Sequence, residues 1–396
     1  MFRSTALGLA AMLALAGSAA AQQQPPPARA QGRPDRMTAS PLAPLPPRLT
    51  TTPAERIPLD RIRVPAGFEV EVWASGMPGA RMMALSPNGT LFVGTRTIGR
   101  VYAVTQKDGQ RTHRVIAQGL RQPNGVAFRD GSLFVIAINE VRRYDGIEQK
   151  LDNPGEPVNL TAAFNLPTEE HHGWKFAAFG PDGKLYMQVG APCNICRIDE
   201  NRHALILRYN PDGSGREIMA RGVRNSVGFD WQPGTNLLWF TSNGRDWAGD
   251  DTPSDILGVV RRPGEHFGFP YCHAGDFQDP DVKGRQCSEF SAPVLRLGPH
   301  VAALGMRFYT GAMFPAEYRG NIFIARHGSW NRTEKTGFDV VRVSFDANGT
   351  PKMEPFMTGL LQGNEYYGRP TDVQMLPDGS LLVSDEQNGA IYRISH

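Results

Sequence analysis

The feature that most constrains this chain is a short pattern that recurs six times along its 396 residues. Each copy has an alternating apolar strand, a turn built mostly on Asp-Gly or Asn-Gly, and a second strand rich in Leu, Val and Phe. Glycine supplies the positive φ that such a turn needs. Most copies are followed by a third strand of the form of Val141-Arg142-Arg143. The copies lie at 84–96, 127–137, 177–190, 227–244, 306–328 and 373–389. This repetition predicts an all-β fold, a six-bladed β-propeller of four-stranded antiparallel blades.

Composition agrees with one closed domain over residues 55–396. The 43 glycines and 32 prolines suit many short strands joined by turns. No long segment has an apolar period of 3.6 residues, so we expect few and short helices. The formal net charge of +3 is small and its basic residues are dispersed, which favours a solvated surface over a nucleic-acid partner.

The first residues have the pattern of an export signal. Arg3 precedes an apolar run at 6–16, and Ala19-Ala20-Ala21 offers a small-residue cleavage site. We therefore expect a signal peptide over 1–21, too short in its apolar part to remain as a membrane span. Residues 22–54 are rich in Pro, Gln and Arg and are predicted to be a disordered tether. These features predict a periplasmic protein.

Four cysteines fit an exported chain. Cys193 and Cys196 stand close together, whereas Cys272 and Cys287 bracket a loop. A c-type haem would need His after Cys196, and position 197 is Arg. Structural zinc would need the two pairs to converge, but they belong to different blades. Two local disulfides are favoured over free thiols or a metal site, so electrons would leave through a separate carrier.

Three loops interrupt the strand pattern with polar residues that are costly to bury: 168–175, which contains His171 and His172; 221–228, which contains Arg224 and Asn225; and the Asp-rich loop 243–255. Equivalent positions of successive blades converge on the propeller axis. Each loop alone has a structural explanation, such as a turn or a cap. Together they predict one site near the axis.

At these residues the chain resembles the soluble quinoprotein sugar dehydrogenases, and most closely their sorbosone or aldose dehydrogenase branch. The resemblance extends from about Leu59 to Ile394. It depends on the spacing from His172 to Gly183, on Arg224 to Gly228, on the Asn-Gly-Arg-Asp loop with its Gly-Asp-Asp, and on the segment 327–332. The family implies a six-bladed propeller that oxidises a sugar with pyrroloquinoline quinone and calcium.

The resemblance also implies roles for individual residues. His172, by its spacing to Gly180-Pro181-Asp182, is the general base, since a neutral imidazole accepts a hydroxyl proton near pH 7. Calcium would polarise the quinone and be held partly by the main-chain carbonyls of Gly249 and Asp250. Carboxylates for a second, structural calcium are available at Asp246, Asp251 and Asp255.

The quinone is a polycarboxylate, and its pocket requires fixed cations. Arg224 and Asn225 match the family's pair of cofactor contacts, and Arg369 matches the first basic residue of its last-blade motif. Arg81 and Arg326 lie near the entry loop of the first blade and a basic position of the fifth. For these two, an ordinary salt bridge at the channel rim is the competing interpretation.

Two positions depart from the family pattern. Glucose-specific members have Asp where this chain has His171, so a carboxylate that orients the base is either missing or supplied by Glu169 or Glu170. A second arginine of the last-blade motif is replaced by Thr371. That clamp is lost unless Arg326 or Arg332 replaces it.

Two other functions remain open at this stage. A six-bladed lactonase would be a hydrolase with an axial divalent metal held by Glu, Asn and Asp side chains, where this chain has His and Arg. A non-catalytic propeller would be a binding module and would take up no cofactor. The sugar, the electron acceptor (a cytochrome or a quinone) and the oligomeric state cannot be read from the sequence. Trp174, Trp330 and Tyr367 are candidates for substrate contacts or for packing.

Overall fold

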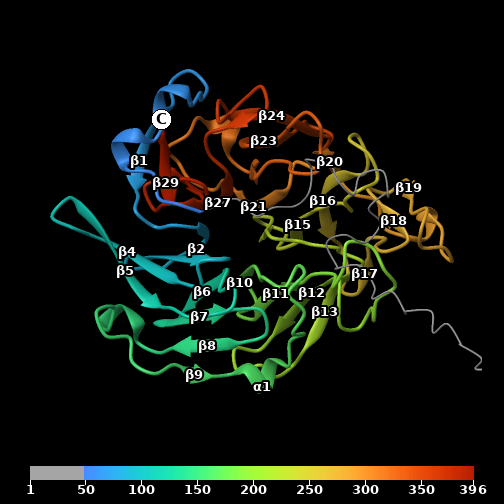
Figure 1. The fold of residues 1–396 in the computed structure, drawn as a ribbon, viewed down its shortest axis with the longest axis horizontal. Helices are drawn as coiled ribbons and strands as arrows, with labels where there is room; N and C mark the ends of the chain where they lie inside the picture. The colour runs from blue at the N-terminus through green and yellow to red at the C-terminus, as the bar shows by residue number, and fades with distance from the viewer. Residues whose placement is uncertain (1–48) are drawn as a thin grey trace, which may run out of the picture.

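The computed structural model describes residues 49–396, and Figure 1 shows their strands arranged as small sheets around a ring in chain order. The predicted signal peptide and most of the predicted tether lie outside the described residues. Six main sheets form the ring, which confirms the six-bladed propeller. No helix among residues 49–396 is long and apolar enough to cross a membrane.

The blades follow the repeats of the sequence. Blade one is β2 (Ala80–Leu85), β3 (Leu91–Thr95), β4 (Val101–Lys107) and β5 (Gln110–Ala117); blade two is β6 (Gly125–Arg129), β7 (Ser132–Ile136), β8 (Val141–Tyr144) and β9 (Val158–Asn159); blade three is β10 (Ala177–Phe179), β11 (Leu185–Val189), β12 (Leu205–Tyr209) and β13 (Glu217–Arg221). Blade four is β14 (Phe229–Trp231), β15 (Leu238–Ser242), β16 (Ser254–Val260) and β20 (Leu295–Pro299); blade five is β21 (Ala303–Phe308), β22 (Ile322–Arg326), β23 (Asp339–Phe345) and β24 (Pro351–Met357); blade six is β27 (Pro370–Met375), β28 (Leu381–Asp385), β29 (Ala390–Ser395) and β1 (Glu69–Ala74).

Blade six closes the ring with both ends of the described chain. Its outermost strand is β1, which pairs antiparallel with β29 through Glu69↔Ser395 and Val72↔Tyr392. Figure 1 shows this blue strand beside the red C-terminal strands. Pairing of an early strand with the last one satisfies backbone groups that an open sheet edge would expose. The sequence repeats did not predict that a strand from before the first repeat completes the last blade.

Helices are few among residues 49–396, as expected. They are α1 (Thr161–Phe164) and short 3-10 turns at Ala54–Arg56, Leu59–Arg61, Ile147–Gln149, Cys287–Glu289 and Ala316–Tyr318. Small additional strands are β17 (Glu265–His266), which pairs with β13, and the hairpins β18 (Cys272–His273) with β19 (Phe277–Gln278) and β25 (Leu361–Gln362) with β26 (Glu365–Tyr366).

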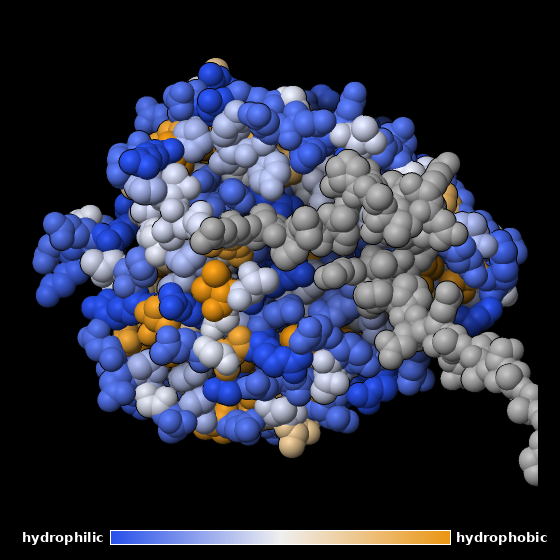
Figure 2. Space-filling view, viewed as in Figure 1, coloured by the Kyte–Doolittle hydropathy of each residue, from blue (hydrophilic) through white to orange (hydrophobic). Residues whose placement is uncertain are grey.

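The core consists of apolar layers between neighbouring blades. Between blades six and one, Met83 and Tyr102 pack in one cluster with Leu382 and Ile391, and all four are almost fully buried. Each such side chain contributes about 1.5–3 kcal/mol by leaving water. The view in Figure 2 shows a largely hydrophilic surface, with apolar side chains in small separate groups.

Antiparallel order decides where the loops meet. Successive strands of a blade run in opposite directions, so the connections between second and third strands lie on the same face as those from one blade to the next. We call this the crossover face. It carries the loops that contain His172, Arg224, Asp250, His327 and Arg369.

Candidate active site

His172 lies on the crossover face just before β10, buried to 6% exposure. Its Nδ1 lies 2.9 Å from the carbonyl oxygen of Ala191. A carbonyl can only accept a hydrogen bond, so Nδ1 carries the proton and Nε2 keeps its lone pair. The residue has a φ of 51°, an uncommon value for a residue other than glycine. A Cβ at Gly190 would lie 2.4 Å from the His172 Cβ, so position 190 has no room for a side chain.

Charge and burial keep His172 neutral. Burial is the main cause that lowers the pKa of His172 well below its usual value, followed by the neighbouring His171 and Arg224. The two imidazole rings have centroids 4.0 Å apart. Burial, Arg224 and Arg96 together lower the pKa of His171 to about 3. Both rings are therefore available as bases across the neutral range.

Neither acidic neighbour contacts the His172 imidazole. The carboxylate of Glu169 lies 3.4 Å from His203, and that of Glu170 forms a hydrogen bond of 2.6 Å with Arg121. The Ala191 carbonyl does the work that a carboxylate at position 171 would do. This resolves the alternatives left open by the sequence at His171.

Arg224 organises the loops around His172. Its guanidinium donates to the backbone of Asn194 (3.0 Å) and Gly244 (2.7 Å), to the Asn194 side chain (2.8 Å) and to the Asp246 carboxylate (3.2 Å). Asn225 donates to Asn243 at 3.2 Å, while its own Oδ1 is buried without a partner among residues 49–396. Arg224 thus holds the site together, and Asn225 has acceptor capacity left for a ligand.

A second group of charges spans the junction of blades six and one. Arg81 donates to Glu386 at 2.6 Å and to Asn124 at 2.8 Å, and His327 Nε2 donates to the same Glu386 oxygen at 2.8 Å. Arg369 donates weakly to the carbonyls of His327 and Gly328, at 3.3 and 3.2 Å. The salt-bridge interpretation therefore holds for Arg81.

The charged side chains of this group shift one another's pKa values. Burial would raise the pKa of the Glu386 carboxyl, but Arg81, His327 and Arg369 outweigh it and hold that pKa far below its usual range. Burial and Arg369 lower the pKa of His327 to about 3. With His327 neutral, Glu386 pairs with Arg81, while the side chains of Arg96 and Arg369 form no ion pair within residues 49–396, so the positive charge of the junction is only partly balanced.

Arg326 is placed apart from this group. It forms a two-pronged ion pair with Asp339, the opposite residue of the neighbouring strand, at 2.7 and 2.5 Å, and donates to Leu297. Arg332 is likewise engaged, with the carboxylate of Asp251 at 3.0 Å. Thr371 is fully buried and its hydroxyl contacts Ser384 Oγ at 2.7 Å. None of the three supplies a free cation.

The two predicted calcium ligands already accept hydrogen bonds. The Gly249 carbonyl lies 2.7 Å from His300 Nε2, and the Asp250 carbonyl accepts from Arg332 Nε at 3.3 Å. No group of three or more His, Cys, Asp or Glu side chains suited to a metal occurs within the described part of the chain. A calcium ion would have to share the Asp250 carbonyl with the Arg332 guanidinium, which opposes its binding, and the Gly249 carbonyl with the His300 imidazole.

Both predicted disulfides are confirmed. Cys193 pairs with Cys196 and Cys272 with Cys287, and no cysteine is free in the described range. The first disulfide brackets Asn194, the residue that receives Arg224. The second lies in the segment between β16 and β20, where the Asp279 carboxylate accepts from Arg245 at 2.9 Å. The first disulfide thus lies beside the residues that surround His172, whereas the second stabilises the segment between β16 and β20.

Sequence reasoning missed three residues near the site, of which Lys175 and Glu386 are buried and Arg96 is half-buried. Lys175, directly before β10, is 1% exposed, and burial lowers its pKa to about 7 despite Glu169. Glu386 anchors the junction of blades six and one. Arg96 follows β3, and its guanidinium lies 3.7 Å over the Trp174 ring. Arg96 and Glu386 each come directly after the second strand of a blade, as the Asp-rich loop does in blade four. Comparison of equivalent positions in the six repeats could therefore have identified them from the sequence.

Unsatisfied polar atoms gather on the crossover face. Buried atoms without a hydrogen-bond partner among residues 49–396 include Arg96 Nε, Gln122 Oε1, His171 Nε2, Trp174 Nε1, Gln188 Oε1, Asn225 Oδ1, Asn331 Nδ2 and Gln387 Oε1. Each such atom costs about 1–3 kcal/mol when its bond is not made. Their concentration around His172 and the arginines indicates a polar ligand site.

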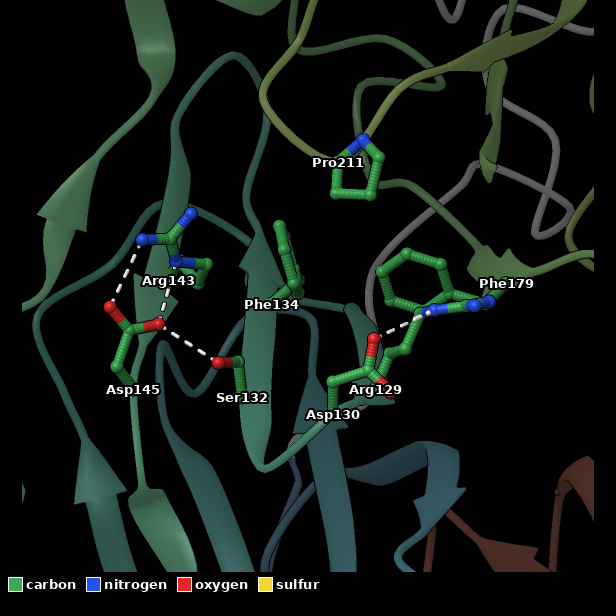
Figure 3. A pocket seen from close by; sticks show the side chains of 8 residues that line it. All are labelled: Arg129, Asp130, Ser132, Phe134, Arg143, Asp145, Phe179 and Pro211. Atoms are coloured by element: carbon green, nitrogen blue, oxygen red, sulfur yellow. Dashed lines mark hydrogen bonds and ion pairs between the residues drawn. The ribbon is translucent and has the colours of Figure 1, made fainter. Parts of the chain in front are cut away.

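A separate pocket lies on the opposite face, between blades two and three. Figure 3 shows it lined by Phe134 and Phe179 and by charged side chains such as Arg143, which is paired with Asp145 at 2.6 Å. Arg129 also has its own partner, Asp130. With its cations already paired, this pocket is a weaker candidate than the crossover face.

Comparison with known proteins agrees with the fold. The sequence model of the TrAA12-like family matches residues 195–396. The chain belongs to the TrAA12-like family. A relative from Borreliella burgdorferi without an assigned function is 30% identical over 87% of this chain and 93% of its own length. The resemblance to quinoprotein sugar dehydrogenases is thereby confirmed at the level of the family.

Other relatives of this TrAA12-like protein have named activities. The aldose sugar dehydrogenase YliI of Escherichia coli is 27% identical over 46% of this chain and 45% of its own length. A pyrroloquinoline quinone-dependent pyranose dehydrogenase of Coprinopsis cinerea is 28% identical over 36% of this chain and 21% of its own length. The chain therefore spans less than half of these two enzymes.

Solved structures share the whole fold. A calcium structure of a carbohydrate-active enzyme of family AA12 from Trichoderma reesei has a TM-score of 0.72 at 20% identity, covering 87% of this chain and 100% of that one. The holo form of the Coprinopsis cinerea pyranose dehydrogenase quinone domain has a TM-score of 0.71 at 19% identity, covering 88% and 98%. At these identities the likeness concerns the propeller itself.

Proposed function

We propose that this protein is a sugar dehydrogenase that uses pyrroloquinoline quinone, with His172 as the general base. The observation that carries the proposal is the neutral His172, set beside an excess of arginines and surrounded by buried polar atoms that lack partners. A polycarboxylate cofactor complements that charge, and its oxygens complement the free donors. The named relatives that bind this quinone support the same cofactor.

Several residues would hold the quinone. Arg369 makes only long hydrogen bonds to backbone carbonyls, so its guanidinium can take a stronger carboxylate partner. Asn225 offers its buried Oδ1 as an acceptor for the ring N–H of the quinone, whereas Arg81 is held by Glu386 and lies behind the site. Arg224 would act from behind, by fixing the loop that carries Asn194. When bound, the quinone accepts the hydride that leaves the sugar carbon.

The protein's own part is to move a proton. Nδ1 of His172 stays anchored on Ala191, and the lone pair of Nε2 accepts the proton of the sugar hydroxyl. The low pKa of His172 keeps this lone pair available at acidic pH but makes it a weak base. Its buried position removes competing water. The imidazolium formed in the reaction lies near Arg224, so we expect it to lose its proton rapidly.

Calcium and location are finer parts of the proposal. We keep calcium at the Gly249 and Asp250 carbonyls as a prediction, although the donors at these oxygens oppose it, and assign no step to it. A periplasmic protein exported by the signal at 1–21 is supported by the two disulfides. Oxidation of a sugar in that compartment requires a separate electron acceptor, a cytochrome or a quinone.

The test is reconstitution of purified protein with pyrroloquinoline quinone. We expect stoichiometric binding in the absorbance spectrum and reduction of a dye when aldoses are added. His172→Ala should still bind the quinone but lose about 10²–10⁴-fold in turnover, the usual contribution of a general base. Absence of quinone binding by the wild-type protein, with or without calcium, would rule the proposal out. The lactonase alternative would then be tested by lactone hydrolysis.

A further inference from the structure

Arg96 differs from the other arginines of the site because it has no protein partner for its donors. It is the first residue after β3 and begins a loop of the crossover face. Its guanidinium donates no hydrogen bond and forms no ion pair within residues 49–396, and its Nε is buried without a partner. Arg81, Arg224 and Arg369 all donate to protein groups. Arg96 is half-buried overall, and a cation whose buried Nε has no partner is costly unless a ligand supplies one.

The position of Arg96 is nevertheless fixed. Its guanidinium lies 3.7 Å over the Trp174 ring, and the Trp174 ring contacts the His172 ring edge-on at 5.7 Å. A guanidinium stacked flat on an indole keeps its N–H edges free for planar recognition of a carboxylate. Trp174 Nε1 is also buried without a partner among the described residues. The stack therefore presents unused donors beside the base.

The charge around Arg96 calls for an anion. Burial above all, together with Arg81 and Arg369, lowers the pKa of Arg96 to about 10 against the opposing effect of Glu386. Each of these arginines disfavours the charge of the next, and the single carboxylate of Glu386 is already bonded to Arg81 and His327. A bound carboxylate at Arg96 would offset this repulsion.

We propose that Arg96 binds a carboxylate of the quinone, in place of the basic residue that Thr371 replaces. The inference rests on the proposed function, since the quinone is the anion. Thr371 is buried and neutral, and Arg326 and Arg332 are held by Asp339 and Asp251. Arg96 belongs to blade one, whereas Thr371 belongs to blade six. The cation for this carboxylate would therefore come from the opposite side of the junction between the two blades.

The experiment compares quinone affinity in Arg96→Gln with that in Arg100→Gln, a matched control on an exposed arginine of the same loop. Affinity is measured by absorbance titration with pyrroloquinoline quinone and, separately, with its trimethyl ester, which lacks the carboxylate charges. Arg96→Gln should weaken binding of the acid about 10- to 100-fold, the range for a charge-assisted hydrogen bond. Binding of the ester should change little, and Arg100→Gln should match the wild type.

Three outcomes are distinguishable. Equal affinity of wild type and Arg96→Gln for the acid overturns the role of Arg96 and leaves the proposed function standing. Failure of the wild type to bind the quinone sinks the proposed function itself. If Arg96→Gln does not fold, as judged by thermal unfolding, Arg96→Lys decides. Lysine keeps the charge but cannot offer paired planar donors, so its affinity should fall below that of the wild type, and wild-type affinity would overturn the proposal.

Discussion

The proton on Nδ1 of His172 has a consequence for the pH dependence of catalysis. Burial and the nearby Arg224 lower the pKa of His172, so the base stays unprotonated as the pH falls through 6.5. We predict that kcat/KM stays level from pH 8 down through 6.5 and falls only at lower pH. A pH–rate profile of the reconstituted enzyme measures this. An acid limb centred at 6.5 would mean that the base is a solvent-exposed histidine.

The low pKa of His171 leads to a prediction about how the free energy of unfolding depends on pH. Its pKa is about 3 in the folded protein and about 6.5 when unfolded. The unfolded chain therefore binds the proton first as the pH falls, and folding loses stability below pH 6.5. By linkage this loss is about 2 kcal/mol between pH 7 and pH 5. His171→Gln should escape it, so the free energy of unfolding should fall less in that variant, as measured by urea unfolding at both pH values. An identical loss in both proteins would contradict the low pKa.

At the scale of elements, the loop between β11 and β12 contacts both His172 and Arg224. Ala191 holds His172, and Asn194, enclosed by the first disulfide, receives Arg224 and the Asp246 backbone. We predict that replacing Cys193 and Cys196 by Ser weakens quinone affinity about tenfold, because the loop gains freedom that ligand binding must remove.

The second disulfide provides the control. It closes a segment with a sequence separation of 15, and its removal from Cys272 and Cys287 should cost about 3 kcal/mol of stability by the loop-entropy estimate. Quinone affinity should be nearly unchanged. Thermal unfolding and quinone titration of both variants separate the two effects. Equal affinity losses in both would show that loop 190–196 has no special role.

The same loop shows what sequence could and could not predict. Repeated turns predicted the blades, because each turn needs Gly at a fixed offset. His172 was predicted to be the base from its spacing to such a turn, and that role stays a prediction. The orienting group was not predicted, because a backbone carbonyl such as that of Ala191 has no sequence signature. Arg96 stands within an ordinary repeat, and its lack of a partner appears only once all neighbours are placed. β1 precedes the first repeat and has no turn of its own.

At the scale of the whole molecule, β1 holds the ring closed. Because consecutive residues of a strand point their N–H groups to opposite sides, a proline pair at Glu71 and Val72 removes at least one donor facing β29. We predict a loss of about 3 kcal/mol or more together with weaker quinone binding. The same pair at Val158 and Asn159, in the outer strand of blade two, is the control and should keep the affinity. Calorimetry and quinone titration measure both. Intact affinity in the first variant would show that closure does not shape the site.

The junction between blades six and one also determines when, during synthesis of the chain, the group of charged residues around Glu386 becomes complete. Arg81 and Glu386 are 305 positions apart in sequence, and the strand that joins their blades pairs with the last one. A chain emerging from its N-terminus can assemble five blades before β29 exists, yet has no complete anion pocket until that strand arrives. Under the proposed function, uptake of the quinone would therefore require β29, and a polypeptide that ends before this strand would bind none.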